Sequence, residues 1–205
     1  MSAPLRLYED AALTQIVSVN ASFNNPDDES NLSGTNGQVA EAPLWVAPEQ
    51  TKLDGGIDDT QTAITLVAAR FADTDYSVII FPTGEKALIT GGHGTKNLTV
   101  IRGWDGTTPA AHSDGDAVIA AYNFSDITID CIDNQGTDES DLMLYCDDDG
   151  GSPDESWEAP HSIGSLNYNE SKKIWRQLTV EAGTATENKH DLQHVFTFGM
   201  EEEGC

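Results

Sequence analysis

The stretch best equipped for chemistry is residues 101–118, IRGWDGTTPAAHSDGDAV. It places Arg102 and His112 among three aspartates and several glycines. Arg, His and Asp are the residue types that transfer protons, bind anions or coordinate metals. The same types also build loops that do no chemistry, because glycine allows the positive φ of tight turns and Arg donates to unpaired carbonyls.

We interpret this stretch as a structural loop. Its glycines suit tight turns, and Asp105 and Asp114, each before a glycine, are expected to bond nearby backbone N–H groups. Arg102 and the ring N–H of His112 are expected to donate to carbonyls left unpaired at the end of a sheet. The predicted brace, with no catalytic residue, consists of Arg102, Gly103, Asp105, Gly106, His112 and Gly115.

Other combinations with chemical potential fit their motifs poorly. His190 and His194 would form a metal-ligand pair on a helix, but the alternation of Leu192, Phe196 and Phe198 favours a strand, where residues four apart lie about 13 Å from each other. The acidic segment 146–155 departs from the calcium-loop register, because Gly151 stands where the third ligand belongs.

A glycine-rich stretch at residues 90–96 lacks the G-x-x-x-x-G-K-[ST] spacing of a phosphate loop. We therefore expect no cofactor and no metal site. Solvent cations at the acidic surface are the expected ionic partners.

The elements that carry these residues are predicted to be strands, because the apolar segments are short, show few helical periods and are separated by turn residues. The predicted strands are Leu5–Glu9, Thr14–Asn20, Pro43–Ala47, Ala63–Ala68, Tyr76–Phe81, Lys86–Thr90, Asn97–Arg102, Ala117–Tyr122, Ile127–Ile132, Leu142–Cys146, Ile174–Val180 and Leu192–Phe198.

The fold class is therefore all-β, and there are more strands than one immunoglobulin-sized sandwich holds. We predict an immunoglobulin-like β-sandwich formed by residues 1–47 and 123–205, with a small β-domain inserted at residues 48–122. Hairpin tips tolerate such insertions. Three consecutive β modules remain the alternative.

Charge limits the partners that the chain can bind. It has 35 acidic residues against 10 Lys and Arg, a net charge of −25 and a pI near 4.1. Nucleic acid and anionic membranes are unexpected partners, because both need clustered basic residues. The acids lie in short clusters between apolar runs, which is typical of a surface adapted to strong brine. The alternative interpretation, an ordinary acidic protein or a nucleic-acid mimic, remains open.

The chain has three cysteines, an odd number that defines no disulfide framework. Cys131 and Cys146 could face each other across neighbouring strands, but we expect buried free thiols. No apolar stretch approaches the length of a membrane span, and the start MSAPLRLYED lacks the features of an export signal.

Residues 52–122 resemble a known family. The runs LDGGIDDTQTAITLVAA, YSVIIFPTGEKALIT and KNLTVIRGWDGTTPAAHSDGDAV are similar to the small β-domain of tail, baseplate and fibre proteins of tailed bacteriophages and their archaeal relatives. The family pattern is a strand ending in Arg-Gly, a Gly-Thr-Thr turn, small residues with a His, and a Gly before the returning strand. The matching positions are Arg102, Gly103, Gly106, Thr107, Thr108, Ala110, Ala111, His112, Gly115 and Val118.

The flanks, LRLYEDAALTQIVS and IWRQLTVEAGTATENKHDLQHVFTF, resemble an immunoglobulin-like accessory sandwich of virus tails. The resemblance implies a non-enzymatic virion protein of a tailed virus, here of a halophilic archaeon. It would assemble in the tail or baseplate with copies of itself and other virion proteins. A head-surface turret or decoration protein is the alternative, as is a receptor- or glycan-binding module that meets the host surface through Trp104, Trp157 or Trp175.

Overall fold

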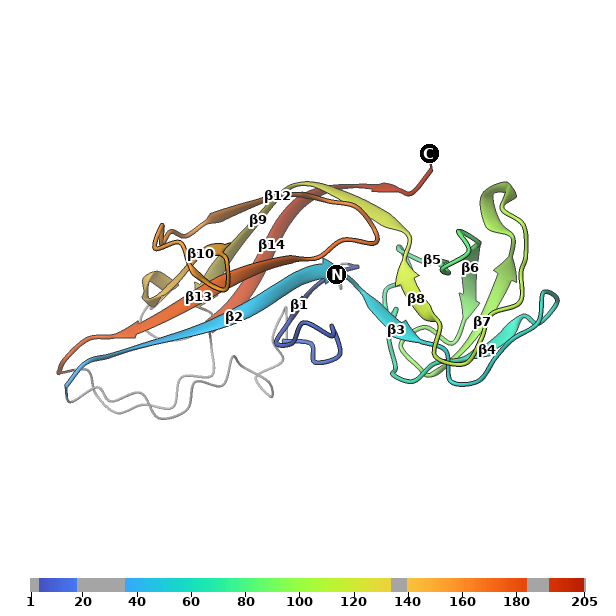
Figure 1. Ribbon diagram of the computed structural model, residues 1–205, viewed down its shortest axis with the longest axis horizontal. Coiled ribbons are helices and arrows are strands. Elements are labelled where there is room, and N and C mark those ends of the chain that lie inside the picture. The colour runs from blue at the N-terminus through green and yellow to red at the C-terminus, as the bar shows by residue number, and fades with distance from the viewer. Residues whose placement is uncertain (1–3, 18–35, 134–139, 184–191, 205) are drawn as a thin grey trace.

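The structure is all-β, as the sequence predicts. The computed structural model describes residues 4–17, 36–133, 140–183 and 192–204. Within these residues the helical elements are two three-residue 3-10 turns, η1 (Trp104–Gly106) and η2 (Ser140–Leu142). The strands form three antiparallel sheets, and Figure 1 shows an elongated molecule with a long sandwich at one end and a small curled sheet at the other.

Two of the sheets form the sandwich. The five-stranded sheet runs β1 (Leu5–Tyr8), β2 (Gln38–Pro48), β13 (Lys172–Val180), β10 (Met143–Asp149) and β11 (Ser152–Pro153). The three-stranded sheet runs β12 (His161–Leu166), β9 (Tyr122–Asp133) and β14 (Leu192–Glu202). The Tyr145 hydroxyl links the sheets, because it lies 2.6 Å from Nδ1 of His194 and donates to the carbonyl of Asp130.

The third sheet is curled almost into a barrel. Its order is β3 (Gln50–Lys52), β8 (Ala117–Ala120), β5 (Val78–Ile80), β6 (Lys86–Gly91), β7 (Asn97–Arg102) and β4 (Ala63–Thr65). A bridge between Leu53 and Leu66 joins its two edges, because the strands continue past β3 and β4 and hydrogen-bond there. Closing a sheet in this way removes the unpaired edges that would otherwise attract other chains.

Strand β7 shows why these residues form such a sheet. Its buried positions, Leu98 and Val100, alternate with the exposed positions Asn97, Thr99 and Ile101. Side chains on a strand point to opposite faces with a period of two. The apolar set therefore lines the interior of the barrel, and the other set lies on its outer surface.

The curled sheet and the sandwich draw their strands from separate parts of the chain. All strands between Gln50 and Ala120 belong to the curled sheet, and all strands before Pro48 or after Tyr122 belong to the sandwich. The chain passes between the two at Glu49 and Ala121, where the Ala120 N–H donates to the Glu49 carbonyl at 2.8 Å. That residues 48–122 are an independent inserted domain stays a prediction.

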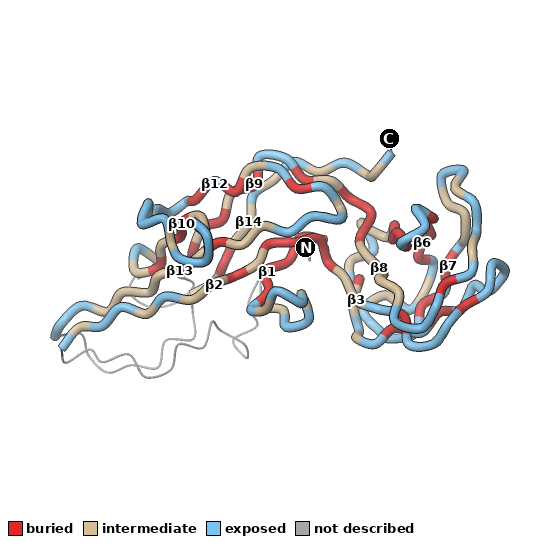
Figure 2. The backbone as a smooth tube through the Cα atoms, viewed as in Figure 1, coloured by how far each residue is buried: buried red, intermediate tan, exposed pale blue. Residues whose placement is uncertain are grey.

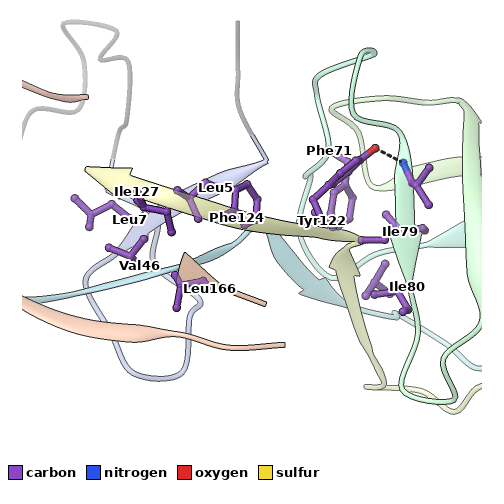
Figure 3. Packing of buried hydrophobic residues seen from close by; sticks show 14 of the residues in the cluster. Leu5, Leu7, Val46, Phe71, Ile79, Ile80, Tyr122, Phe124, Ile127 and Leu166 are labelled. Atoms are coloured by element: carbon purple, nitrogen blue, oxygen red, sulfur yellow. Dashed lines mark hydrogen bonds between the residues drawn. The ribbon is translucent and has the colours of Figure 1, made fainter. Parts of the chain in front are cut away.

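Buried side chains continue across this junction. Figure 3 shows Leu5, Val46 and Ile127 packed in the sandwich, with Tyr122 and Ile79 on the barrel side. The Tyr122 hydroxyl accepts a hydrogen bond from the Val78 N–H at 3.2 Å. Figure 2 likewise shows buried backbone running from β2 and β9 into the curled sheet, so the sandwich and barrel share one apolar cluster.

Several predicted strand boundaries are wrong. Pro43–Ala47 is part of the longer strand β2, and the separate strands predicted at 117–122 and 127–132 are β8 and a longer β9 that begins at Tyr122. Among the described residues of the predicted strand 14–20, Ile16 forms only an isolated bridge to Tyr8. The sequence patterns also miss β3, β11 and β12, which are short or interrupted by small residues.

Candidate functional site

The loop of residues 101–118 begins where β7 ends, with Arg102 as the last strand residue. Gly103, Gly106 and Gly115 all adopt positive φ, at 64°, 75° and 83°, as the sequence predicts. At Gly103 the need for glycine is strict, since a Cβ there would lie 2.8 Å from the Thr107 carbonyl oxygen and 2.9 Å from Cδ of Pro109. The loop thus turns sharply back over the end of the barrel immediately after Arg102.

Arg102 uses all five of its N–H donors. Nε and one Nη2 proton form a bidentate pair with the Glu85 carboxylate at 2.6 and 2.7 Å. The other three donors meet carbonyl oxygens, those of Asp58 at 2.9 Å, Gln61 at 3.0 Å and Ala110 at 2.6 Å. Arg102 therefore ties together three chain segments that lie far apart in the sequence.

Glu85 is the centre of this arrangement, and its side chain is 0% exposed. It lies at the end of the turn between β5 and β6, where the Phe81 N–H donates to the Glu85 carbonyl. Besides the two bonds from Arg102, its carboxylate accepts the N–H of Ala110 at 2.9 Å and that of Gly103 at 3.3 Å. We call Glu85, Arg102 and His112 the buried hub.

His112 completes the hub, but not with the partner expected from the sequence. Its Nε2 lies 2.9 Å from the Glu85 carboxylate, whereas the sequence predicts a backbone carbonyl as its partner. Because an ionised carboxylate can only accept, Nε2 carries the proton. The ring is fully buried and stacks on Phe81 with centroids 4.2 Å apart, so its position is set by packing as well as by the hydrogen bond.

The electrostatics of the hub favour a permanently ionised Glu85. Burial by itself would raise the pKa of this carboxyl group, but the hydrogen bonds from Arg102, Ala110 and His112 outweigh burial and lower the pKa to about 2. A carboxyl group held this far below neutral pH is a poor general acid or base, because catalysis favours a pKa near the working pH.

Two of the three aspartates of the loop, Asp105 and Asp114, were expected to bond nearby backbone N–H groups, and their partners differ from those expected. Asp105, itself at a positive φ of 54°, pairs its carboxylate with Nζ of Lys86 at 2.9 Å instead of capping a nearby N–H. Lys86 also lies 3.5 Å from Glu202 at the end of β14, so it connects the barrel to the sandwich. Asp114 does accept a backbone N–H, but that of the distant Gly55, at 2.8 Å.

The hub as a whole resembles a structural joint more than a reaction centre. The side chains of Glu85 and His112 are 0% exposed and that of Arg102 is 4% exposed. All donors of Arg102 are engaged, and no serine, threonine or cysteine hydroxyl or thiol is hydrogen-bonded to His112 among the described residues. The geometry therefore fixes these three side chains within the interior of the barrel.

The second acidic candidate is part of a hairpin. Residues expected to form a solvated loop after Cys146 extend β10 to Asp149, which pairs with Ser152 of β11. Asp148 pairs with Nζ of Lys173 at 2.6 Å and accepts the indole N–H of Trp175 at 2.7 Å. These bonds lower the pKa of Asp148 and bind its carboxylate to groups of the protein itself.

The histidines and cysteines are also placed in structural surroundings. His190 lies outside the described residues, so the expectation that His190 and His194 are ordinary strand histidines is tested only at His194, which lies in β14 and is buried against Tyr145. Cys131 and Cys146 are buried and free of each other, as expected, and Cys205 lies outside the described residues. Burial raises the pKa of the Cys146 thiol to about 11, which keeps it protonated.

The tryptophans suggested as stacking platforms are half-buried. Trp104 packs against the apolar cluster. Trp157 donates its indole N–H to Glu155 at 3.2 Å, and the ring of Trp175 is covered by Nζ of Lys173 at 4.6 Å from its centroid. Each of these three side chains therefore already has a partner within the protein.

Sequence reasoning missed Glu85 and His161. Glu85 has its partners 17 to 27 positions away, so no local motif signals it. His161, 4% exposed at the start of β12, lies between Glu158 at 3.0 Å and Asp147 at 3.1 Å. Glu85 is a single acidic residue after a turn, and His161 is a single histidine at the start of a strand. Both patterns are too common in sequences to indicate a site.

No group of three or more His, Cys, Asp or Glu side chains in the described ranges is placed to hold a metal ion. The same part of the chain contains no helix long and apolar enough to cross a membrane. Protein-family models, curated proteins and solved structures were each compared with the chain, and none of the three comparisons found a match.

Proposed function

We propose that the chain is a non-enzymatic virion structural protein, assembled in many copies in the tail or baseplate of a tailed virus of a halophilic archaeon. The observation that carries the proposal is the role of the loop 101–118. The residues that resemble the viral β-domain motif form a joint with Glu85, in which each donor of Arg102 meets an acceptor. Such a motif serves the rigidity of a building block.

The distribution of charge supports the same proposal. A net charge of −25 would destabilise a compact chain through self-repulsion in dilute buffer. In about 1 M salt the Debye length falls to about 3 Å, and the repulsion is largely screened. A protein that works in strong brine therefore gains solubility from its acidic surface at little cost in stability.

Buried polar contacts at the junction of sandwich and barrel support a role in an assembly, where subunits must keep their shape. The junction contains a buried ion pair of Arg6 and Glu49 at 3.1 Å. The Tyr8 hydroxyl donates to the Pro48 carbonyl and accepts the Gln50 N–H, both at 3.2 Å. The mechanism would be packing: subunits of fixed shape contact one another in a symmetric array.

Labelling of intact particles tests the proposal. Antibodies raised against the purified chain should mark tailed particles from the source culture, and cryo-electron microscopy should place the density of the chain in the tail or baseplate. Density on the head surface would move the protein to the turret or decoration class. Absence of the chain from purified particles would refute a virion role.

A further inference from the structure

The C-terminal end of β14 leaves the sandwich and reaches the barrel. Its pairing with β9 continues to Glu202, which lies opposite Tyr122, the first residue of β9. One residue further, the Glu203 N–H donates to the Ala121 carbonyl at 2.9 Å. Figure 1 shows this end of the chain on the side of the sandwich that faces the barrel. We call residues 200–204 the C-terminal strap.

Ala121 connects the strap to the barrel through its backbone. Its carbonyl accepts the Glu203 N–H, and its own N–H donates to the carbonyl of Val78 in β5 at 3.0 Å. The carboxylate of Glu203 also accepts a hydrogen bond from the side-chain amide of Asn123 in β9. The backbone of one residue thus joins the end of a sandwich sheet to a strand of the barrel.

Lys86 is the second link between the strap and the barrel. It is the first residue of β6, and its side chain is 5% exposed. Its Nζ lies 2.9 Å from the Asp105 carboxylate and 3.5 Å from that of Glu202. A Cβ on Gly204 would lie 3.3 Å from the same Nζ, so the backbone after Glu202 also passes close to it. One amine therefore contacts both a barrel loop and the strap.

The charge of Lys86 suits this position. Burial by itself would lower the pKa of Lys86, but Asp105 and Glu202 outweigh burial and raise it, so the amine stays protonated at neutral pH. The strap contains three consecutive glutamates, residues 201–203, which an acidic surface repels. Lys86 supplies the positive charge that holds this segment against the barrel.

We infer that the C-terminal strap fixes the orientation of the barrel relative to the sandwich, with Lys86 as the residue that holds it. The chain crosses between the two at Glu49 and Ala121, and these crossings are adjacent, because the Ala120 N–H donates to the Glu49 carbonyl. Two adjacent crossings leave rotation about the line that joins them. Lys86 opposes this rotation from β6, which lies two strands from β8, about 10 Å at the usual strand spacing. The inference goes beyond the proposed function and does not depend on it.

Residual dipolar couplings of the backbone amides test the inference, because they report how each part of the chain is oriented in a partly aligned sample. The sample is purified full-length chain in molar KCl within a stretched polyacrylamide gel. In the wild-type chain, the couplings of barrel and sandwich should fit one alignment tensor. In Lys86→Met, which keeps an apolar stem, and in Glu202→Gln, the barrel couplings should shrink relative to those of the sandwich.

Amide hydrogen exchange measures the same loosening at the junction. Exchange of the Ala121 amide should become about two- to fivefold faster in Glu202→Gln, the range expected for a partly exposed ion pair. The matched control is Lys173→Met. Lys173 pairs with Asp148 at 2.6 Å within the sandwich, so its loss should leave the couplings and the Ala121 exchange unchanged.

Either of two results would overturn the inference. One is a single alignment tensor for Glu202→Gln and Lys86→Met, as in the wild-type chain. The other is a wild-type chain in which barrel and sandwich need separate tensors. The Glu202 side chain is 23% exposed, so Glu202→Gln keeps the test decisive if the Lys86 variant does not fold. None of these results bears on whether antibodies find the chain in virus particles, so the two proposals can fail separately.

Discussion

Replacement of Arg102 by alanine is the most direct test of the buried hub. The substitution removes both hydrogen bonds to Glu85 and leaves that carboxylate with only the N–H groups of Ala110, Gly103 and His112. Removing one partner of a buried ion pair typically costs about 3–5 kcal/mol, because the remaining charge is left uncompensated. We expect Arg102→Ala to lower the free energy of unfolding by this amount.

The hydrogen bonds from Arg102 to backbone carbonyl oxygens contribute less to the expected decrease in the free energy of unfolding. The bonds from Arg102 to Asp58 and Gln61 are exposed, so water replaces them at little cost. The bond to Ala110 is partly buried and adds about 1 kcal/mol. Most of the destabilisation is therefore assigned to the Glu85 carboxylate, an acceptor that the sequence did not reveal.

Urea denaturation in molar KCl measures the decrease in the free energy of unfolding. Arg70→Ala is the matched control. Arg70 also lies in the part of the chain that forms the curled sheet, between β4 and β5. Its guanidinium donates to the carbonyls of Ala69 and Thr14. We expect Arg70→Ala to cost about 1 kcal/mol or less, in the range of ordinary neutral hydrogen bonds. A loss from Arg102→Ala no larger than this would refute the reasoning.

A double-mutant cycle with Glu85→Gln separates the ion pair from other effects. Residues in one hydrogen-bond network show interaction energies of about 0.5–3 kcal/mol. We therefore expect the double variant to be clearly more stable than the sum of the two single losses predicts. Additive losses would mean that Arg102 acts mainly through its carbonyl bonds.

Three further predictions follow from the hub, the charge and the loop. The pKa of Glu85 is lowered from 4.5 to about 2 in the folded state, so its contribution is present above pH 4.5 and is lost as the pH falls toward 2. This loss amounts to about 3 kcal/mol, and Glu85→Gln should flatten that part of the profile of unfolding free energy against pH. With a net charge of −25, the melting temperature should rise between dilute and molar KCl, and an unchanged melting temperature would contradict adaptation to brine. Gly103→Ala should cost more than about 1 kcal/mol in urea denaturation. Gly106→Ala has a similar φ but open space for a Cβ, so it should cost less, and equal losses would exclude a steric role for the Thr107 carbonyl.

Local sequence patterns predicted the fold class well because strand formation depends on near neighbours. In β7 the alternation of Leu98 and Val100 with polar residues is visible in the sequence and is confirmed by burial. The positive φ of Gly103, Gly106 and Gly115 was predictable for the same reason, since the residue preferences of turns are local. Boundaries failed where a strand such as β9 continues through alternation too irregular to recognise.

The sequence by itself thus determined the all-β class, the excess of acidic residues, the turns of residues 101–118 and the role of Arg102 as a donor to backbone carbonyls. Only the tertiary structure showed that Glu85 is the partner of Arg102 and His112, and that Asp105 pairs with Lys86. It also showed that β4 pairs with β7, so that exposed residues of the two strands share one outer face of the barrel. The physical reason is that hydrogen bonds and shared surfaces depend on proximity in space, and these partners are brought together only when the sheet curls.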